Sequence, residues 1–323
     1  MERIARTLRS ELTVAPYNDS YVYCADMKVL VIGASGFIGL PTAQALVRAG
    51  HYVIGLTRTQ AKAKLLAAEE IVPLIGEVDK PEEWIKVIAD LDAIIEIVGG
   101  TAKQLVSQTL EFVTKVTPEL RPAGAPKLTY IYTSGTWVHG ENRTDIVTDT
   151  TPLRSPAQLV AWRPACEQAV VKNTTVNGIV IRPALLYGRA GSLLAPFFKS
   201  ASEGKVWYPG TPGGRFALVH CDDLADLYVR AVERSSLVAG QIFDAANDFT
   251  ESVDDVLNAL AKASGATSPP EYREPANLYE VALGTTHLIR PYLARSLLGW
   301  RPSKPGLVDG MPIYYAAWKA TQE

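Results

Sequence analysis

The chain has few of the residues that build disulfide frameworks or metal centres. Among its 323 residues are 3 cysteines and 4 histidines. Cys24, Cys166 and Cys221 lie far apart in the sequence and show no metal-ligand spacing, which argues against a disulfide framework and leaves no candidate metal site. A reducing, intracellular setting fits this cysteine content, so we expect a cytoplasmic protein.

Long apolar runs and strong charge are also missing. No uninterrupted apolar run reaches the length that spans a bilayer, and the first residues lack the apolar centre of a secretory signal. The formal net charge is only −2, and no cluster of basic residues is interleaved with aromatic ones. These absences argue against membrane and nucleic-acid partners. We therefore expect a soluble protein whose partner is a small-molecule substrate.

Residues 1–26 differ from the rest of the chain. They mix arginines with acidic residues, and Met27 stands directly before the first apolar run. We expect an N-terminal extension that is flexible or loosely docked. A weak organelle-targeting segment is the alternative, although Glu2 and Glu11 count against it.

The segment Lys28–Gly39, KVLVIGASGFIG, carries three glycines spaced three apart. Val29–Ile32 form an apolar, β-branched stretch that predicts a central parallel strand. Gly33 then allows a tight turn, Gly36 lets the backbone approach a pyrophosphate, and Gly39 lets a helix pack on the strand. An ordinary tight loop is the alternative, but the context favours a dinucleotide site. The predicted contacts are Gly33, Ser35, Gly36, Phe37, Ile38 and Gly39.

Strand-like and helix-like segments alternate through residues 27–188. Strands are expected at 51–58, 71–76, 91–100, 127–135 and 176–188, with helices near 84–88, 103–115 and 167–172. This alternation predicts an α/β fold, a Rossmann-type doubly wound parallel sheet. Ligands of such sheets lie beyond the carboxyl ends of the strands. The residues expected to converge there are Gly33, Arg58, Gly99, Thr133, Ser134 and Pro183.

The composition shifts toward glycine and proline after Gly188, as in Tyr208–Arg215. Residues 189–323 are expected to form mostly a smaller C-terminal substrate-binding region, with 216–250 returning to the Rossmann domain. Phe216–Glu233 predicts a short strand and an amphipathic helix, whose first turn Asp222 or Asp223 would cap. The aromatic walls of a substrate cleft are expected from Trp137, Trp162, Trp207 and Tyr208.

Several segments together resemble the extended and atypical short-chain dehydrogenase/reductase superfamily, especially its NAD-dependent epimerase/dehydratase branch. They are GASGFIG, YTSGTWVHG, RPALLYG, FALVHCDDLADLYVRAV and LLGWRP, in the expected order from Met27 almost to the last residue. The resemblance implies a domain that binds NAD(H) or NADP(H) and a substrate domain that closes over it. It also implies that Glu77 and Val78 lie near the adenine, and Val98 and Gly99 near the adjacent ribose. Members are often homodimers, so pairing of two copies stays open.

Charge near the second strand predicts which coenzyme binds. An NAD site usually places an acidic residue there to accept hydrogen bonds from the ribose hydroxyls, whereas a 2′-phosphate needs a cation. Residues 40–68 contain no Asp or Glu, but they contain Arg58 and Lys62. A guanidinium binds a phosphate through two hydrogen bonds, so we expect Arg58, assisted by Lys62, to favour NADP(H). A merely solvated Arg58 is the alternative.

The family's proton-transfer pattern is absent. Relatives that move hydride normally carry a Ser or Thr and a Tyr-x-x-x-Lys pair. Counting from Glu167 places the Tyr position at Leu159 and the Lys position at Arg163, while the Ser position falls on Gly135. Arg163 can hold ribose hydroxyls, but it is a poor general acid or base because its pKa lies far above neutral. Tyr187 and His139 are the candidate replacement acids, and Ser134, one residue from the Ser position, is a further candidate catalytic residue; structural roles stay open for Tyr187 and His139.

Two functions remain in competition. One is an NADP(H)-dependent oxidoreductase of epimerase/dehydratase-like type, acting on a small organic or sugar-like substrate without the usual Tyr-x-x-x-Lys pair. The other is a non-catalytic NADP(H)-binding sensor or scaffold. Loss of the pair favours the second, and the long C-terminal substrate region favours the first.

Overall fold

The computed structural model describes residues 27–99, 102–189 and 193–322. The expected N-terminal extension, residues 1–26, lies outside the described residues.

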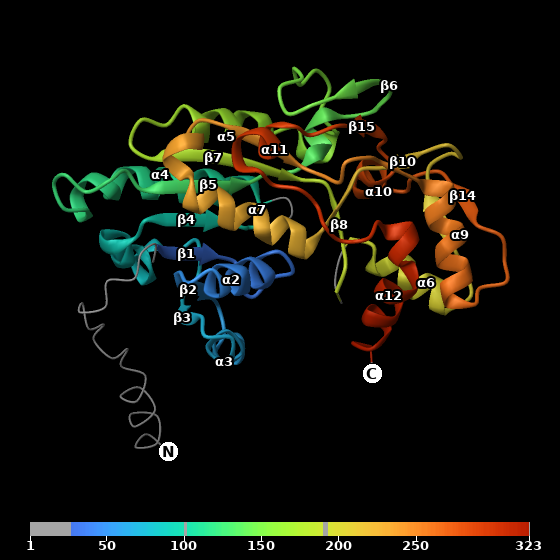
Figure 1. Cartoon of the computed structure of the whole chain (residues 1–323), viewed down its shortest axis with the longest axis horizontal. Coiled ribbons are helices and arrows are strands. Elements are labelled where there is room, and N and C mark those ends of the chain that lie inside the picture. Colours follow the sequence, from blue (N-terminus) through green and yellow to red (C-terminus); the bar gives the residue numbers. More distant parts are fainter. Residues whose placement is uncertain (1–26, 100–101, 190–192, 323) are drawn as a thin grey trace, which may run out of the picture.

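A 7-stranded parallel sheet is the centre of the molecule (Figure 1). Its strand order is β12-β7-β5-β4-β1-β2-β3. The strands are β1 (Lys28–Ile32), β2 (Tyr52–Thr57), β3 (Val72–Ile75), β4 (Ala93–Glu96), β5 (Thr129–Thr133), β7 (Asn177–Pro183) and β12 (Ile242–Ala245). Chain order reverses at β1, which has β2 on one side and β4 on the other. A ligand crevice is expected above such a reversal, at the carboxyl ends of the strands. The Rossmann-type α/β prediction is confirmed.

Helices cover both faces of the sheet, which explains why its strands are almost wholly apolar. One face packs against α2 (Gly39–Arg48), α3 (Gln60–Ala68), α7 (Cys221–Glu233), α8 (Ser235–Val238) and α11 (Leu293–Leu298). The other packs against η1 (Pro81–Glu83), η2 (Ile85–Asp90), α4 (Lys103–Leu120) and α5 (Arg163–Val171). The helix expected near 84–88 is instead two short 3₁₀ segments, η1 and η2, which meet at Trp84. The Trp84 indole donates to the Glu77 carbonyl oxygen at 3.1 Å, which ties this segment to the end of β3.

A second hydrophobic core lies beside the sheet, under α6 (Ala195–Ser202), α9 (Val253–Ser264) and α12 (Leu307–Lys319) (Figure 1). Short strands and helices join it to the sheet. They are β6 (Asn142–Val147), β8 (Leu185–Tyr187), β9 (Trp207–Pro209), β10 (Arg215–Phe216), β11 (Leu218–His220), β13 (Glu251–Ser252), β14 (Glu271–Arg273), β15 (His287–Ile289), α10 (Leu278–Leu283), η3 (Thr136–His139) and η4 (Gln158–Val160). Tyr208 is fully buried in this core and donates to the Gly284 carbonyl oxygen at 3.1 Å. Tyr208 and Trp207 therefore do not form the cleft walls expected of them.

No helix in the described part of the chain is both long enough and apolar enough to cross a membrane.

Candidate functional site

The turn between β1 and α2 requires glycine at two positions. Gly33 has φ +88°, and a Cβ there would lie 2.6 Å from the Ile97 carbonyl oxygen. A Cβ on Gly39 would lie 2.0 Å from the Gly33 carbonyl oxygen. Any side chain at either position would push the turn away from β4 or the helix away from the turn. The glycine spacing therefore reflects real close approaches of the backbone.

The first turn of α2 suits an anionic ligand. Its N-cap, Ile38, makes no side-chain hydrogen bond to the helix, and the first turn holds no acidic residue. The Leu40 N–H already donates to the Gly36 carbonyl oxygen at 2.9 Å, so the positive end of the helix dipole is the feature of this helix start that favours a phosphate. Beside it, the hydroxyls of Ser35 and Thr57 lie 3.5 Å apart. The turn therefore fits the pyrophosphate of a dinucleotide.

A pocket of about 630 Å³ opens next to this turn, over the carboxyl ends of the strands. On the strand side it is lined by Gly36, Phe37, Ile38, Ile97, Val98, Gly99, Thr133, Ser134, Gly135, Pro183 and Ala184. The rest of its described lining is Thr136, Trp137, Leu159, Val160, Arg163, Leu185, Leu186, Leu193 and Tyr279. A Cβ on Gly99, three residues after the end of β4, would meet no atom of the described part of the chain within 4 Å. The volume lies within the usual range for cofactor and substrate sites.

Arg163 is the one charged side chain among the described residues of this lining. It begins α5 and is 8% exposed. Its guanidinium donates to the Tyr132 hydroxyl at 3.3 Å and to the Thr133 carbonyl oxygen at 3.1 Å, and it stacks 5.0 Å from the centre of the Trp162 ring. These contacts hold the cation at the end of β5.

Leu159 lines the same pocket as Arg163. These two residues occupy the positions at which the family pattern has its tyrosine and lysine. At the site of the expected phenol, the pocket therefore has an aliphatic side chain. No proton donor is available at position 159.

Ser134 lines the pocket, but its hydroxyl is engaged away from it. The hydroxyl donates to the carboxylate of Glu167, which is 1% exposed. Arg182 donates to both oxygens of that carboxylate, at 3.0 and 2.7 Å. Ser134 is thus the end of a buried ionic network.

The network continues through β12. The Arg182 guanidinium lies 3.5 Å from Asp244, which also pairs with His139 at 2.9 Å. Burial opposes ionisation of Asp244, but the hydrogen bond and charge of His139 and the charge of Arg182 outweigh it and lower its pKa. His139 is therefore part of the network, and it is not among the described residues that line the pocket.

Tyr187 lies at the end of β8, inside the second core, and is not among the described lining residues. It is fully buried. Its hydroxyl donates to the Pro305 carbonyl oxygen at 2.9 Å and accepts from the Asn247 amide at 3.2 Å. Burial raises the pKa of Tyr187 well above its ordinary value. The structure does not bring this phenol together with Arg163.

Of the residues predicted at the adenosine end, Val98 and Gly99 line the pocket, whereas Arg58, Lys62, Glu77 and Val78 follow β2 and β3 and are not among the described lining residues. Arg58 and Lys62 are exposed, on the β2–α3 loop and in the first turn of α3. The Glu77 carboxylate pairs with Lys80 at 2.8 Å, and Lys80 lowers the pKa of Glu77, with a smaller contribution from Arg58. Arg58 and Glu77 are therefore neighbours in space. Val78 packs against the core on the other face of the sheet.

Glu96 is a buried carboxyl at the end of β4, just before the pocket residues Ile97 and Val98. It is 1% exposed and accepts a hydrogen bond from the Tyr130 hydroxyl. Burial raises the pKa of Glu96 to about 8, although Tyr130 and the charge of Arg163 act in the opposite direction. A buried ionisable group thus directly precedes two residues of the pocket lining.

Several pocket residues had no role assigned from the sequence, among them Thr136, Leu185, Leu193 and Tyr279. Tyr279 comes from the short helix α10, more than 90 residues beyond the last strand-end lining residues. Its ring contacts Trp137 edge to face, with centroids 6.3 Å apart, and its hydroxyl donates to the Leu193 carbonyl oxygen at 3.5 Å. Of the four aromatic walls predicted, Trp137 is the one that lines the pocket. No periodic or motif signal marks Tyr279 in the sequence.

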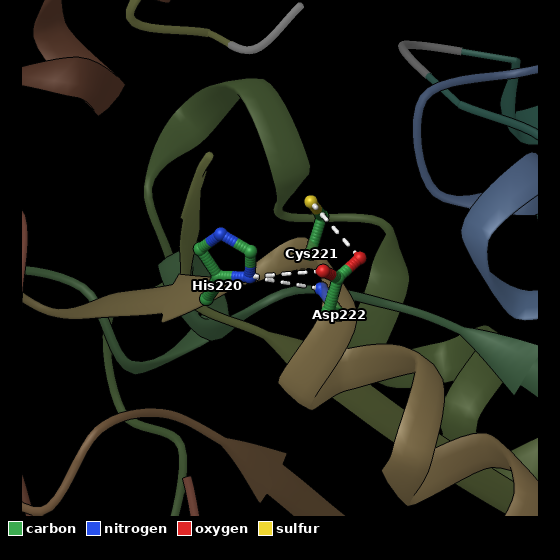
Figure 2. Close-up of side chains that lie close together, drawn as sticks. All are labelled: His220, Cys221 and Asp222. Atoms are coloured by element: carbon green, nitrogen blue, oxygen red, sulfur yellow. Dashed lines mark hydrogen bonds and ion pairs between the residues drawn. The ribbon is translucent and has the colours of Figure 1, made fainter. Parts of the chain in front are cut away.

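His220, Cys221 and Asp222 form a compact cluster at the start of α7 (Figure 2). The His220 Nδ1 accepts a hydrogen bond from the Asp222 N–H at 3.1 Å, so His220 caps the helix, the role that was expected of Asp222 or Asp223. The Asp222 carboxylate pairs with Arg189 at 2.8 Å and Lys304 at 3.8 Å. Burial raises the pKa of Cys221 to about 12. Because the Nδ1 of His220 and the carboxylate of Asp222 already have partners, we interpret the cluster as a helix cap.

Known proteins are similar to the chain over most of its length. It is 25% identical over 301 residues to an uncharacterized protein of Schizosaccharomyces pombe, covering 88% of this chain and 98% of that relative. It is 28% identical over 313 residues to a 3-diazoavenalumate denitrifying reductase of a Streptomyces species, covering 88% and 99%.

Solved structures show the same fold. A UDP-glucose 4-epimerase of Thermotoga maritima superposes with a TM-score of 0.74 at 18% identity, covering 92% of this chain and 100% of that one. A UDP-glucuronic acid 4-epimerase of Bacillus cereus, in complex with UDP-glucuronic acid and NAD, gives a TM-score of 0.72 at 20% identity, covering 91% and 100%. The model of the NAD dependent epimerase/dehydratase family matches residues 29–246. With the glycine turn and all of the described pocket lining except Tyr279 inside the matched region, the chain belongs to the NAD dependent epimerase/dehydratase family.

Proposed function

We propose that this protein is an NADP(H)-dependent oxidoreductase that acts on a small organic molecule without a Tyr-x-x-x-Lys pair. The observation that carries the proposal is the continuity of the pocket. One cavity of about 630 Å³ runs from the glycine turn at Gly36 to Leu193 and Tyr279 of the C-terminal region. A bound coenzyme and a second molecule would therefore share one space.

Backbone geometry supports the coenzyme half of the proposal. The turn at Gly33 and Gly39 and the uncapped start of α2 would hold the pyrophosphate. Val98, Gly99, Thr133 and Pro183 line the path from this turn toward Arg163. When bound, a reduced nicotinamide coenzyme supplies a hydride. Arg163, held by Tyr132 and Thr133, would donate hydrogen bonds to the nicotinamide ribose.

Charge supports a preference for the phosphorylated coenzyme. Arg58 is exposed at the carboxyl end of β2, and Lys62 lies one helical turn further on. The nearest carboxylate, Glu77, is already paired with Lys80. The surface where the adenosine ribose would lie thus has a net positive character, which suits a 2′-phosphate.

The proton that accompanies hydride transfer needs a source other than position 159. Ser134 is engaged with Glu167, and Thr133 shares a hydrogen bond of 2.7 Å with Tyr228. Tyr187 lies in the second core. The other hydroxyls in the described lining belong to Thr136 and Tyr279, and Tyr279 makes only a long hydrogen bond of 3.5 Å, to the Leu193 carbonyl oxygen. We therefore propose Tyr279 or Thr136, with water behind it, as donor, in place of Tyr187 and Ser134.

A non-catalytic NADP(H) sensor or scaffold is the second candidate. Leucine at position 159 and arginine at position 163 favour it, because neither residue transfers a proton at neutral pH. The second half of the pocket favours the enzyme, since binding of the coenzyme alone does not need Leu193 or Tyr279.

Hydride transfer can be tested directly with coenzyme deuterated at the reactive carbon. Purified protein is incubated with this NADPH and a mixture of neutral ketones and aldehydes, and the products are analysed by mass spectrometry. The proposal predicts an alcohol that carries one deuterium. Tight NADPH binding with no labelled product from any carbonyl compound would instead favour the sensor.

A further inference from the structure

The part of the pocket opposite the glycine turn is apolar. Its walls are Leu159, Val160, Leu185, Leu193, Trp137 and Tyr279. The only charged lining residue in the described chain, Arg163, is already held by Tyr132, Thr133 and the Trp162 ring. A ligand here meets hydrocarbon and aromatic surface and few charges.

We propose that the substrate is a neutral, flat, mainly apolar carbonyl compound, and that Trp137 and Tyr279 determine this specificity. The inference rests on the proposed function and narrows its substrate class. The two rings meet edge to face at 6.3 Å with an interplanar angle of 80°. Both residues line the pocket, so their aromatic surface is available to a planar ligand. Leu159, at the position of the family's phenol, extends the apolar wall.

A nucleotide sugar fits this half of the pocket poorly. Its diphosphate carries negative charge, and burying charge against apolar walls without a partner is costly. It also brings a second nucleotide into a cavity of about 630 Å³ that the nicotinamide end already has to share. A single ring with one carbonyl oxygen needs only one hydrogen-bond donor. Tyr279 or Thr136 can supply that donor.

The test measures binding, so that it does not depend on turnover. The full chain is saturated with NADP⁺, whose affinity is measured first, and is then titrated by calorimetry with 2-acetylnaphthalene or with UDP-glucose. We expect the ketone to bind at least about tenfold more tightly than UDP-glucose. Tyr279→Leu, which keeps apolar volume but removes the ring, should weaken ketone binding about three- to tenfold. Tyr279→Phe, which keeps the ring, should weaken it less than Tyr279→Leu.

Tyr292→Phe is the matched control, because Tyr292 is 42% exposed and lies outside the described lining. It should leave both affinities unchanged. Equal or tighter binding of UDP-glucose would overturn the inference, as would no ketone binding by protein that still binds NADP⁺, or Tyr279→Leu behaving like the unmodified chain. Failure to bind NADP⁺ or NADPH at all would overturn the proposed function itself, and the inference with it.

Discussion

The two halves of the pocket are defined in different ways. On the coenzyme side, backbone atoms set the geometry: Gly33 and Gly39 leave no room for a Cβ, whereas a Cβ on Gly99 would meet no atom of the described residues within 4 Å. On the substrate side, side chains from distant segments do so, with Leu159 from η4 and Tyr279 from α10. A backbone-defined site tolerates little change, whereas a side-chain-defined site can change its chemistry while the fold stays the same.

That contrast explains what the chain keeps and what it lacks. The glycine turn matches its family because the close approaches forbid alternatives. The Tyr-x-x-x-Lys positions hold Leu159 and Arg163, both of which still face the pocket. The same scaffold thus presents an apolar wall where the resemblance implies an acid.

The largest effect is expected from the buried network behind the coenzyme side. Arg182→Leu leaves the carboxylates of Glu167 and Asp244 buried without their shared cation. The free energy of unfolding should fall by about 3 to 5 kcal/mol in urea denaturation. Arg143→Leu breaks an ion pair with Glu141 of 2.6 Å between side chains that are 40% and 50% exposed, and it should cost less than about 1 kcal/mol. Equal losses of unfolding free energy in the two variants would show that burial of the Arg182 ion pairs does not increase their contribution to stability.

Next in size is the glycine turn. Gly39→Ala places a Cβ 2.0 Å from the Gly33 carbonyl oxygen, so we expect a loss of about 1 to 3 kcal/mol in stability together with loss of NADPH binding. The Cβ that Gly99→Ala adds meets no atom of the described residues within 4 Å. Its stability should stay unchanged while its affinity for NADPH falls, because the added methyl occupies ligand space. Unchanged NADPH affinity in Gly99→Ala would place the coenzyme elsewhere.

A smaller effect separates the two coenzymes. Arg58→Glu should weaken NADPH binding by about tenfold or more and leave NADH binding nearly unchanged, because it replaces the cation at a 2′-phosphate with an anion. Lys64→Glu, an equal charge change at an exposed position of α3, serves as the control. Fluorescence titration of each variant with both coenzymes measures the ratio of its NADPH affinity to its NADH affinity. If Arg58→Glu and Lys64→Glu shift it equally, general surface charge and not a specific contact explains the preference.

The smallest effect concerns Glu96 and pH. Burial raises its pKa to about 8 from an ordinary value of 4.5, so the folded state holds the proton more tightly than the unfolded state. Its stabilising contribution is complete below about pH 4.5 and is lost as the pH rises through about 8. Glu96→Gln removes this titration, so its stability relative to the unmodified chain should improve by about 1 kcal/mol or more from pH 5 to pH 8. Parallel stability curves for the two proteins over this range would contradict the assignment; Glu203→Gln, at the exposed end of α6, controls for loss of a surface charge.

The sequence predicts the coenzyme half of the molecule because its signals are local. Apolar β-branched runs mark the buried strands, and a glycine pattern marks the turn. Prediction is poorer where the signal is weak, as at β6, an exposed and polar strand that pairs only with β15. It fails for the 3₁₀ segments around Trp84, where a tertiary hydrogen bond to Glu77 decides the local conformation.

The substrate half depends on contacts between segments far apart in the chain. Tyr279 reaches the pocket because α10 packs near η4 and Trp137, which no periodicity in its own segment reveals. Tyr187 and Tyr208 look similar in sequence, but both lie in the second core. The composition of a cleft wall therefore follows from tertiary packing, and only its coenzyme side can be predicted from motifs.

The central claim is that the glycine turn and the apolar wall enclose one pocket that binds a nicotinamide coenzyme. Titration of the purified chain with NADPH, followed by energy transfer from tryptophan to the nicotinamide, tests it most directly because Trp137 lines that pocket. We expect saturable energy transfer whose amplitude falls strongly in Trp137→Leu. The affinity derived from the titration should be higher for NADPH than for NADH. A chain that shows no saturable signal with either reduced coenzyme would contradict it.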